Sequence, residues 1–252
     1  MVLSPATLFT GQQVVWLPAC PSTNTEAAAL LRENRASEGC VVLTDDQTAG
    51  RGQRGNSWES APGENLTLSV VWRPTFLDAG QQFLLSQAVA LGVHDWASAL
   101  LKPASELKLK WPNDIYFGTQ KLGGVLIENS LSGVKIQSSI VGIGLNVNQR
   151  HFHMPTATSL AALTGRHFDR IALTERLLEA LEKRYLQLRA GQVGELRRAY
   201  LAALYRYQEP HDYEVAEGRA RGQIVGVEAD GRLALEIGGE VRRFGLQEVR
   251  YV

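Results

Sequence analysis

A glycine-rich segment that contains two arginines, Gly50-Arg51-Gly52-Gln53-Arg54-Gly55, has the composition of an anion-binding loop. Glycines let the backbone approach a ligand closely, and the guanidinium groups of Arg51 and Arg54 can form paired hydrogen bonds with phosphate or carboxylate oxygens. The spacing also satisfies the dinucleotide pattern G-x-G-x-x-G, which must open a helix, but the following Pro62-Gly63 would end such a helix early. We therefore predict a phosphate-binding loop, with an exposed basic loop as the alternative.

A second segment, Lys110-Trp111-Pro112-Asn113-Asp114, closes an expected strand with a rigid turn. The amide of Asn113 and the carboxylate of Asp114 are oxygen donors of the kind that hold Mg²⁺ on a nucleotide. A plain Pro-Asn-Asp β-turn explains the same residues. The segment is therefore a candidate metal site, and the residues that lie beside it in the fold decide between this interpretation and a plain turn.

Glycines inside two further expected strands indicate the close approach of a ligand. Gly123 and Gly124 follow shortly after Lys121. Gly142 begins the segment Gly-Ile-Gly-Leu-Asn, which ends at Asn146. Such glycines weaken a strand unless something packs against its backbone. Asn146 lies in an apolar stretch, where its amide needs either a structural hydrogen bond or a ligand. Trp58, just after the glycine-rich segment, can stack on a base or fill a core.

The elements that must position these residues follow from hydrophobic patterns. Thr23-Asn24-Thr25-Glu26 has the spacing of a capping box, and we expect a helix from there to Asn34. Further helices are expected over 81–101, 171–190 and 193–205, and the second of these carries an apolar stripe at three- and four-residue spacing. Strands are expected over 41–45, 66–72, 107–111, 122–127 and 134–147. The last three resemble a meander, so the sheet should be mixed or antiparallel.

The chain changes character after Glu209-Pro210. Short alternating strands with Glu-Gly, Asp-Gly and Gly-Gly turns continue to Val252, which predicts a small β-barrel. We place the boundary near Gln208, so that 1–208 and 209–252 form two units.

Composition excludes several classes of protein. The 26 Lys and Arg residues balance the 26 Asp and Glu residues, so no net charge attracts nucleic acid or an anionic membrane. Cys20 and Cys40 are the only cysteines, and Cys40 begins an apolar run, which favours a buried thiol over a disulfide. No signal peptide or long apolar span is visible, and we expect a cytoplasmic protein without a membrane segment.

Taken in this order, the segments resemble the biotin protein ligase family. The resemblance rests on Ser22-Thr23-Asn24, Gln47-Thr48-Ala49 with the glycine-rich segment and Trp58, Lys110–Asp114, Lys121–Glu128, Gly142–Asn148 and 157–160. It implies an α+β fold, with a catalytic domain related to class II aminoacyl-tRNA synthetases and a C-terminal SH3-like barrel. It also implies ATP-dependent conversion of biotin to biotinyl-5'-AMP and transfer to a lysine of a biotin carboxyl carrier protein.

The resemblance assigns roles by position. Ser22, Thr23 and Gln47 would bind the ureido ring of biotin. The implied catalytic residues, which stabilise charge on the carboxylate and the phosphate, are Lys121, Arg51 and Arg54. The backbone that packs on the body of biotin would be that of Gly123, Gly124 and Gly142. The remaining implied ATP contacts are Gly50, Gln53, Trp58, Asn113 and Asn146, with Asp114 on Mg²⁺.

Two features depart from the pattern of the family. Many relatives begin with a DNA-binding winged-helix domain, whereas the first helix expected here starts near Thr23, so a repressor role is not expected. The loop often carries a second arginine where this chain has Gln53, which bears on how tightly the adenylate is held.

Other functions remain open from the sequence. A lipoate or octanoate ligase would share the fold and activate a different acid, and a non-catalytic nucleic-acid-binding module would use the basic loop and the barrel. The neutral net charge argues against the second. The sequence is compatible with a homodimer and does not identify the carrier.

Overall fold

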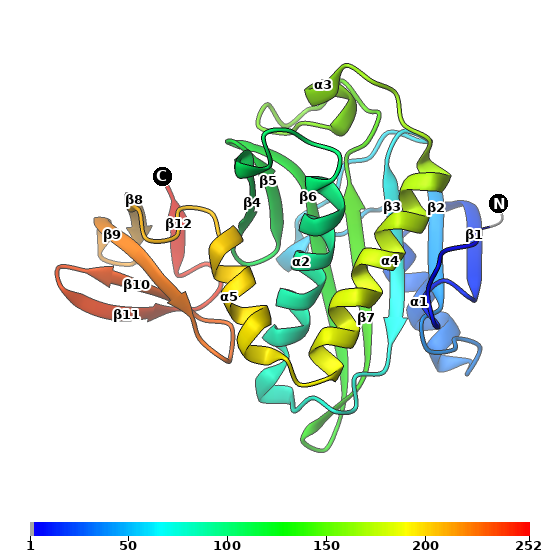
Figure 1. The fold of residues 1–252 in the computed structure, drawn as a ribbon, viewed down its shortest axis with the longest axis horizontal. Coiled ribbons are helices and arrows are strands. Elements are labelled where there is room, and N and C mark those ends of the chain that lie inside the picture. Colours follow the sequence, from blue (N-terminus) through cyan, green and yellow to red (C-terminus); the bar gives the residue numbers. More distant parts are fainter. Residues whose placement is uncertain (1–2) are drawn as a thin grey trace.

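The computed structural model describes residues 3–252, which form a large sheet with helices on both faces and a smaller sheet at the C-terminal end (Figure 1). The large sheet has seven strands in the order β1-β2-β3-β7-β6-β5-β4. The pair β1–β2 is parallel and the other neighbouring pairs are antiparallel, which confirms the predicted mixed sheet. The strands are β1 (Val14–Cys20), β2 (Val41–Gln47), β3 (Leu66–Trp72), β4 (Leu107–Lys110), β5 (Asp114–Phe117), β6 (Gln120–Ser132) and β7 (Lys135–Leu145).

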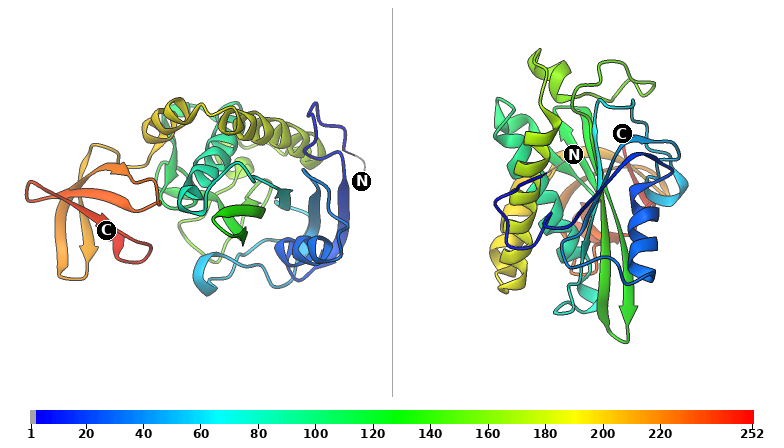
Figure 2. Two further views of the ribbon diagram at one scale, coloured as in Figure 1. Left: turned by 90° about the horizontal axis from the view of Figure 1, so that it is seen from below. Right: turned by 90° about the vertical axis from the view of Figure 1, so that its right-hand side faces the viewer.

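Helices cover both faces of this sheet. On one face lie α2, α4 and α5, whereas α1 lies on the other face (Figure 2). None of the helices within residues 3–252 is both long and apolar enough to cross a membrane. The helices are α1 (Thr23–Arg32), α2 (Phe83–Ser98), α3 (Leu160–Thr164), α4 (Arg170–Arg189) and α5 (Val193–Ala203).

The main core lies between the large sheet and helices α2 and α4. The predicted apolar stripe of α4 is buried, with Leu177, Leu181 and Tyr185 at most 1% exposed. A Cβ atom on Gly92 of α2 would lie 2.9 Å from the Cα atom of Leu181, so α2 can approach α4 this closely only with glycine there. Tyr185 stacks on Trp72 of β3 with 4.3 Å between ring centroids, which joins α4 to the sheet.

Helix α1 packs on the opposite face over a smaller apolar cluster. Cys40 is buried in this cluster, and both cysteines are free, which confirms the predicted buried thiol. Burial raises the pKa of the Cys40 thiol to about 11. The predicted capping box is wrong, because Thr23 is the first residue of the helix and Ser22 occupies the N-cap position, where its side chain makes no capping hydrogen bond. The hydroxyl of Thr23 instead forms a hydrogen bond of 2.7 Å with the hydroxyl of Ser69 on β3. Thr23 therefore contacts the sheet and does not cap the helix.

The C-terminal residues form a five-stranded antiparallel sheet in the order β11-β10-β9-β8-β12. Within the described strands, β11 and β12 are the two edges and do not pair with each other. The closed barrel that the resemblance implies is therefore not confirmed. The strands are β8 (Pro210–Val215), β9 (Gly218–Val227), β10 (Leu233–Ile237), β11 (Glu240–Phe244) and β12 (Val249–Tyr251).

The smaller sheet contacts the large one around the turn between β4 and β5. The indole Nε1 of Trp111 donates a hydrogen bond of 2.9 Å to the carbonyl of Gly231, in the β9–β10 turn. The Nζ atom of Lys110 lies 4.6 Å from the ring centroid of Tyr116 and 4.9 Å from that of Tyr251. Desolvation in this aromatic environment lowers the pKa of Lys110. The two sheets are thus joined beside the Pro112-Asn113-Asp114 turn.

Candidate functional site

A cavity of about 450 Å³ lies on the α1 face of the large sheet. It is bounded by the start of α1, the end of β2, the loop of residues 50–58, and the facing parts of β5, β6 and β7. The cavity brings together most of the residues that the sequence analysis selected, from segments far apart in the chain. Those that line it are Ser22, Thr23, Gln47, Arg51, Gln53, Trp58, Asn113, Asp114, Lys121, Gly124 and Gly142.

Glycines form the floor of the cavity on β6 and β7. Gly124 pairs with Gly144 across these strands, so two backbones lie side by side without side chains. A Cβ atom on Gly144 would lie 2.4 Å from Cε2 of Trp58, and one on Gly142 would clash with the side chain of Asn24. Glycine is therefore needed at both positions for Trp58 and Asn24 to reach the sheet. Gly144 and Asn24 were not among the predicted site residues, although alternate glycines in a strand were a usable signal.

Hydroxyl and amide groups surround one end of the cavity. The Oε1 atom of Gln47 accepts a hydrogen bond from the backbone N–H of Thr23 at 3.0 Å. The hydroxyl of Ser69 lies 2.7 Å from the hydroxyl of Thr23 and 2.6 Å from Oδ1 of Asn24. Ser22, Thr23 and Asn24 are buried, so these groups are held in place and can recognise a neutral polar ring.

A carboxylate connects this polar end to the glycine-rich loop. Oε2 of Glu128 accepts a hydrogen bond from Nδ2 of Asn24 at 2.7 Å and forms an ion pair with Arg51 at 3.0 Å. The side chains of Arg51 and Glu128 are 46% and 40% exposed, so solvent weakens this ion pair. Arg51 can therefore turn toward an anion in the cavity at little cost. Glu128 ends the Lys121–Glu128 segment but was not predicted as a site residue, because its partners Arg51 and Asn24 lie 77 and 104 positions away in the chain.

An ion pair lies at the middle of the cavity. Nζ of Lys121 is 2.7 Å from Oδ1 of Asp114, and it is 5.8 Å from the ring centroid of Trp58. Asn113 precedes Asp114 and donates from Nδ2 to the carbonyl of Val125 at 2.8 Å. The cavity thus offers a fixed cation next to a carboxylate and an aromatic ring.

Two buried polar atoms near the cavity have no hydrogen-bond partner within the described part of the chain. They are Nε1 of Trp58 and Oδ1 of Asn146. The amide nitrogen of Asn146 donates to the carbonyl of Thr158 at 2.9 Å, which fixes the orientation of the side chain. Buried donors and acceptors are rarely left unsatisfied in native proteins. A polar ligand with both a donor and an acceptor would satisfy the two atoms.

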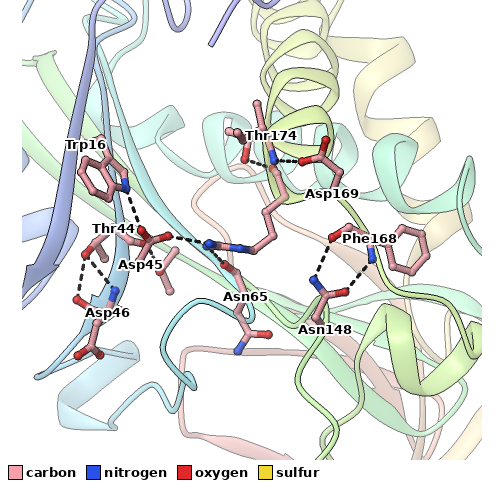
Figure 3. A network of polar contacts seen from close by, with 12 residues as sticks. Trp16, Thr44, Asp45, Asp46, Asn65, Asn148, Phe168, Asp169 and Thr174 are labelled. Carbon is pink, nitrogen blue, oxygen red and sulfur yellow. Dashed lines mark hydrogen bonds and ion pairs between the residues drawn. The ribbon is translucent and has the colours of Figure 1, made fainter. Parts of the chain in front are cut away.

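A polar network outside the cavity holds the neighbouring segments together (Figure 3). Asp45 of β2 pairs with Arg170 of α4 at 2.8 Å and accepts a hydrogen bond from Trp16 of β1 at 3.1 Å. The guanidinium of Arg170 also donates to the carbonyl of Asn65 at 3.4 Å. Nδ2 of Asn65 donates to Oε1 of Gln149 at 2.6 Å. This network fixes the ends of the segments that carry Trp58 and Asn146, and sequence reasoning identified none of its members.

Several predicted site residues do not line the cavity. A Cβ atom on Gly123 would lie 2.5 Å from a methyl group of Leu145, which places Gly123 against β7 rather than in the cavity. Gly50 is covered by Trp58, whose backbone N–H donates to the carbonyl of Gly50 at 2.9 Å. Asn146 is buried and is not among the residues that line the cavity. The side chain of Arg54 lies outside the described part of the structure.

The cavity offers one carboxylate to a divalent metal ion. Asp114 is the acidic residue that lines the cavity, and the described residues contain no group of three His, Cys, Asp or Glu side chains that could hold a metal. Mg²⁺ in nucleotide sites is commonly bound by one or two carboxylates and the phosphates of the substrate. The residues present fit that mode and do not fit a metal site made by protein ligands alone.

Comparison with known sequences gives matches over most of the chain. The biotin/lipoate A/B protein ligase family matches residues 16–146. The biotin--[acetyl-CoA-carboxylase] ligase of Mycobacterium tuberculosis is 34% identical, over 86% of this chain and 81% of its own length. The bifunctional ligase/repressor BirA of Bacillus spizizenii is 35% identical over 69% of this chain. The chain spans 54% of that relative, about half of its length.

Solved structures share the fold over nearly the whole chain. The biotin protein ligase of Aquifex aeolicus in complex with biotin and ATP has a TM-score of 0.79 and 27% identity, covering 96% of this chain and 100% of its own. The Leishmania major biotin protein ligase in complex with biotin has a TM-score of 0.64 at 21% identity, covering 94% and 99%. The second likeness concerns the fold alone.

Proposed function

Because the chain belongs to the biotin/lipoate A/B protein ligase family, we propose that it uses ATP to convert biotin to biotinyl-5'-AMP and transfers the biotinyl group to a lysine of a biotin carboxyl carrier protein. One observation carries the proposal. A single cavity joins the buried hydroxyl and amide groups around Thr23 to the Lys121–Asp114 ion pair and the ring of Trp58. Two ligands would lie in this cavity, an acid that has a polar ring and a nucleotide. The carboxylate of the acid and the phosphates of the nucleotide would then be next to each other.

The polar end of the cavity suits the ureido ring of biotin. This ring carries N–H donors and one carbonyl acceptor, and Ser22, Thr23 and Gln47 supply hydroxyl and amide groups that can meet both. The apolar body of biotin then extends over the glycine floor at Gly124 and Gly142. Its carboxylate reaches Lys121.

The other end of the cavity suits a nucleotide. Adenine stacks on Trp58, whose buried N–H has no hydrogen-bond partner within the described residues, and the edge of the base is recognised by Oδ1 of Asn146, which has none there either. Arg51, Arg54 and Lys121 bind the phosphates. Asp114, with Asn113, would hold a magnesium ion, and that ion would neutralise part of the charge of the triphosphate.

Activation then needs no nucleophile from the protein. An oxygen of the biotin carboxylate attacks the α-phosphorus, the bond from that phosphorus to the pyrophosphate oxygen breaks, and pyrophosphate leaves. Lys121 and Arg51 stabilise the charge that grows on the phosphate oxygens during this step. The loop of residues 50–58 covers the product and excludes water from the mixed anhydride.

Transfer follows when a lysine amine of the carrier attacks the acyl carbon. A C–N bond forms, the C–O bond to the phosphate breaks, AMP leaves with the electron pair, and the amine nitrogen loses a proton to water. Within this proposal the chain acts in the cytoplasm, residues 1–208 form the catalytic domain, and residues 209–252 form an SH3-like unit. A relationship of the catalytic domain to class II aminoacyl-tRNA synthetases belongs to the same proposal.

A lipoate or octanoate ligase is the second candidate, because the matching family includes lipoate ligases. The hydroxyls and amides around Thr23 favour a substrate with a polar ring over an unbranched fatty acid. The test is ATP–pyrophosphate exchange with biotin, lipoate and octanoate in separate reactions. We expect exchange with biotin alone, and exchange that depends on lipoate or octanoate would replace the proposal.

A further inference from the structure

Four side chains form a hydrogen-bonded relay at the polar end of the cavity. Oε2 of Glu128 is 2.7 Å from Nδ2 of Asn24, whose Oδ1 is 2.6 Å from the hydroxyl of Ser69. The hydroxyl of Ser69 is in turn 2.7 Å from that of Thr23. We call this series, from Glu128 through Asn24 and Ser69 to Thr23, the relay. Thr23 and Asn24 line the cavity, whereas Ser69 and Glu128 are not among the lining residues.

The carboxylate of Glu128 fixes the direction of the relay. A carboxylate only accepts hydrogen bonds, so the amide nitrogen of Asn24, and not its oxygen, must face Glu128. The same nitrogen lies 3.4 Å from a second acceptor, the carbonyl oxygen of Leu126. Nη2 of Arg51 is 3.0 Å from the same carboxylate oxygen, so two donors converge on it. The amide oxygen of Asn24 therefore faces Ser69 and can only accept from it.

Each hydroxyl of the relay then has a single role, because a hydroxyl carries only one hydrogen. Ser69 gives its hydrogen to the amide oxygen of Asn24. Ser69 must therefore accept the hydrogen of Thr23, since lone pairs would otherwise face each other at 2.7 Å. The other acceptor near the Thr23 hydroxyl, Oε1 of Gln47, is farther away at 3.4 Å and already accepts the backbone N–H of Thr23. Thr23 is left with lone pairs alone to offer to a ligand.

We infer that Glu128 is a positioning residue that makes Thr23 a hydrogen-bond acceptor, and so selects an acid whose polar ring brings an N–H group to Thr23. The inference rests on the proposed function, which places the ureido ring of biotin at this end of the cavity. The N–H groups of that ring satisfy Thr23, which is buried. The hydrocarbon end of a fatty acid has no donor and would leave the lone pairs of Thr23 unsatisfied, which lowers its affinity.

The test measures binding of the acid without the nucleotide. Glu128→Gln keeps the size of the side chain, but its amide can donate as well as accept, so Asn24 is free to turn and the relay loses its fixed direction. We expect the Kd of biotin, measured by calorimetry without ATP, to rise roughly tenfold, the effect of one buried hydrogen bond. Ser69→Ala interrupts the relay elsewhere and should raise the Kd to a similar extent. Asp78→Asn is the matched control and should leave the Kd unchanged, because it breaks an ion pair of similar exposure with Lys135, and neither residue lines the cavity.

A double-mutant cycle separates this positioning role from a general effect on the fold. Thr23→Val removes the hydroxyl through which the relay acts, so Glu128→Gln should cause no further rise in the Kd of biotin in that background. The same cycle with Ser69→Ala should agree, and it decides the matter alone if Glu128→Gln does not fold. Additive effects in the cycle, or an unchanged Kd in folded Glu128→Gln or Ser69→Ala, would overturn the inference. Failure of the proposed function would be seen separately, as wild-type protein that does not bind biotin.

Discussion

The Nζ atom of Lys121 lies 2.7 Å from Oδ1 of Asp114, and the two side chains meet over Gly124. A Cβ atom on Gly124 would be 3.3 Å from Oδ1 of Asp114 and 3.6 Å from Nζ of Lys121. Glycine at this position therefore leaves room for the ion pair and for a ligand above it. The arrangement places a cation and a carboxylate together at the point where acid and phosphate would meet.

Lys121→Ala should abolish adenylate formation and leave the fold intact. Lys121 is only partly buried, and its main partner is one half-buried carboxylate, so its loss removes little packing. Loss of a group that stabilises transition-state charge typically lowers kcat by about 10²–10³-fold. The measurement is biotin-dependent pyrophosphate exchange, with Lys102→Ala, an exposed lysine, as control. Near-normal exchange in folded Lys121→Ala would remove Lys121 from the catalytic residues.

Gly144→Ala should weaken the binding of ATP. The new methyl group would lie 2.4 Å from the Trp58 ring and displace it from the cavity. Base–aromatic stacking contributes about 1–3 kcal/mol, so we expect the KM for ATP to rise roughly tenfold or more. Gly226→Ala is the control, because a Cβ atom there meets nothing within 4 Å. Equal KM values in the two variants would mean that Trp58 does not contact the nucleotide.

Gln53→Arg should slow the release of biotinyl-5'-AMP. Gln53 lines the cavity, and a guanidinium there could add a charge-assisted hydrogen bond to the phosphate, worth about 1.5–3 kcal/mol. That energy corresponds to a roughly ten- to hundredfold slower release. A single-turnover chase with unlabelled biotin measures the rate. If Gln53→Arg and Gln53→Ala release the adenylate at the same rate, residue 53 does not contact it.

The stability of the protein should fall as pH decreases through about 6.5. Burial lowers the pKa of His94, on α2, below its ordinary value of 6.5, and its Nε2 atom lies 3.3 Å from the carbonyl oxygen of Leu107. Below that pH the unfolded chain binds a proton at His94 that the folded chain does not bind, so unfolding becomes more favourable. Urea denaturation at pH 7.5, 6.5 and 5.5 gives the free energies of unfolding. His94→Gln should show a smaller fall than the exposed control His151→Gln, and identical slopes would exclude His94 as the cause.

The helices and central strands could be predicted because their patterns are local. The apolar stripe of α4 and the apolar run of β3 lie within a residue of their predicted positions, since each buries a face or a whole strand in the core. Strand β1 was not predicted. It is an edge strand that contains Pro18, and only Cys20 among its residues is fully buried, so it lacks a clear hydrophobic signal.

The candidate site was only partly predictable for a related reason. Glycine, arginine and tryptophan in unusual settings, such as Gly142 and Trp58, are visible in the sequence itself. The sequence does not show which residues form hydrogen bonds with partners that are distant along the chain. Asn65 and Gln149 are 84 positions apart and bond at 2.6 Å, and Asn24 and Glu128 are 104 apart and bond at 2.7 Å. The packing of α1 on the sheet brings Asn24 to Glu128, and the pairing of β3 with β7 brings Asn65 to Gln149.

The most direct test of the proposed ligase activity is the mass of the carrier after reaction. The protein is incubated with ATP, magnesium, biotin and a biotin carboxyl carrier domain, beside a carrier whose target lysine is replaced by arginine. We predict that one biotinyl group is added to the unaltered carrier, that the arginine carrier is unmodified, and that omission of ATP or biotin prevents the reaction. A folded protein that leaves the unaltered carrier unmodified under these conditions would contradict the account.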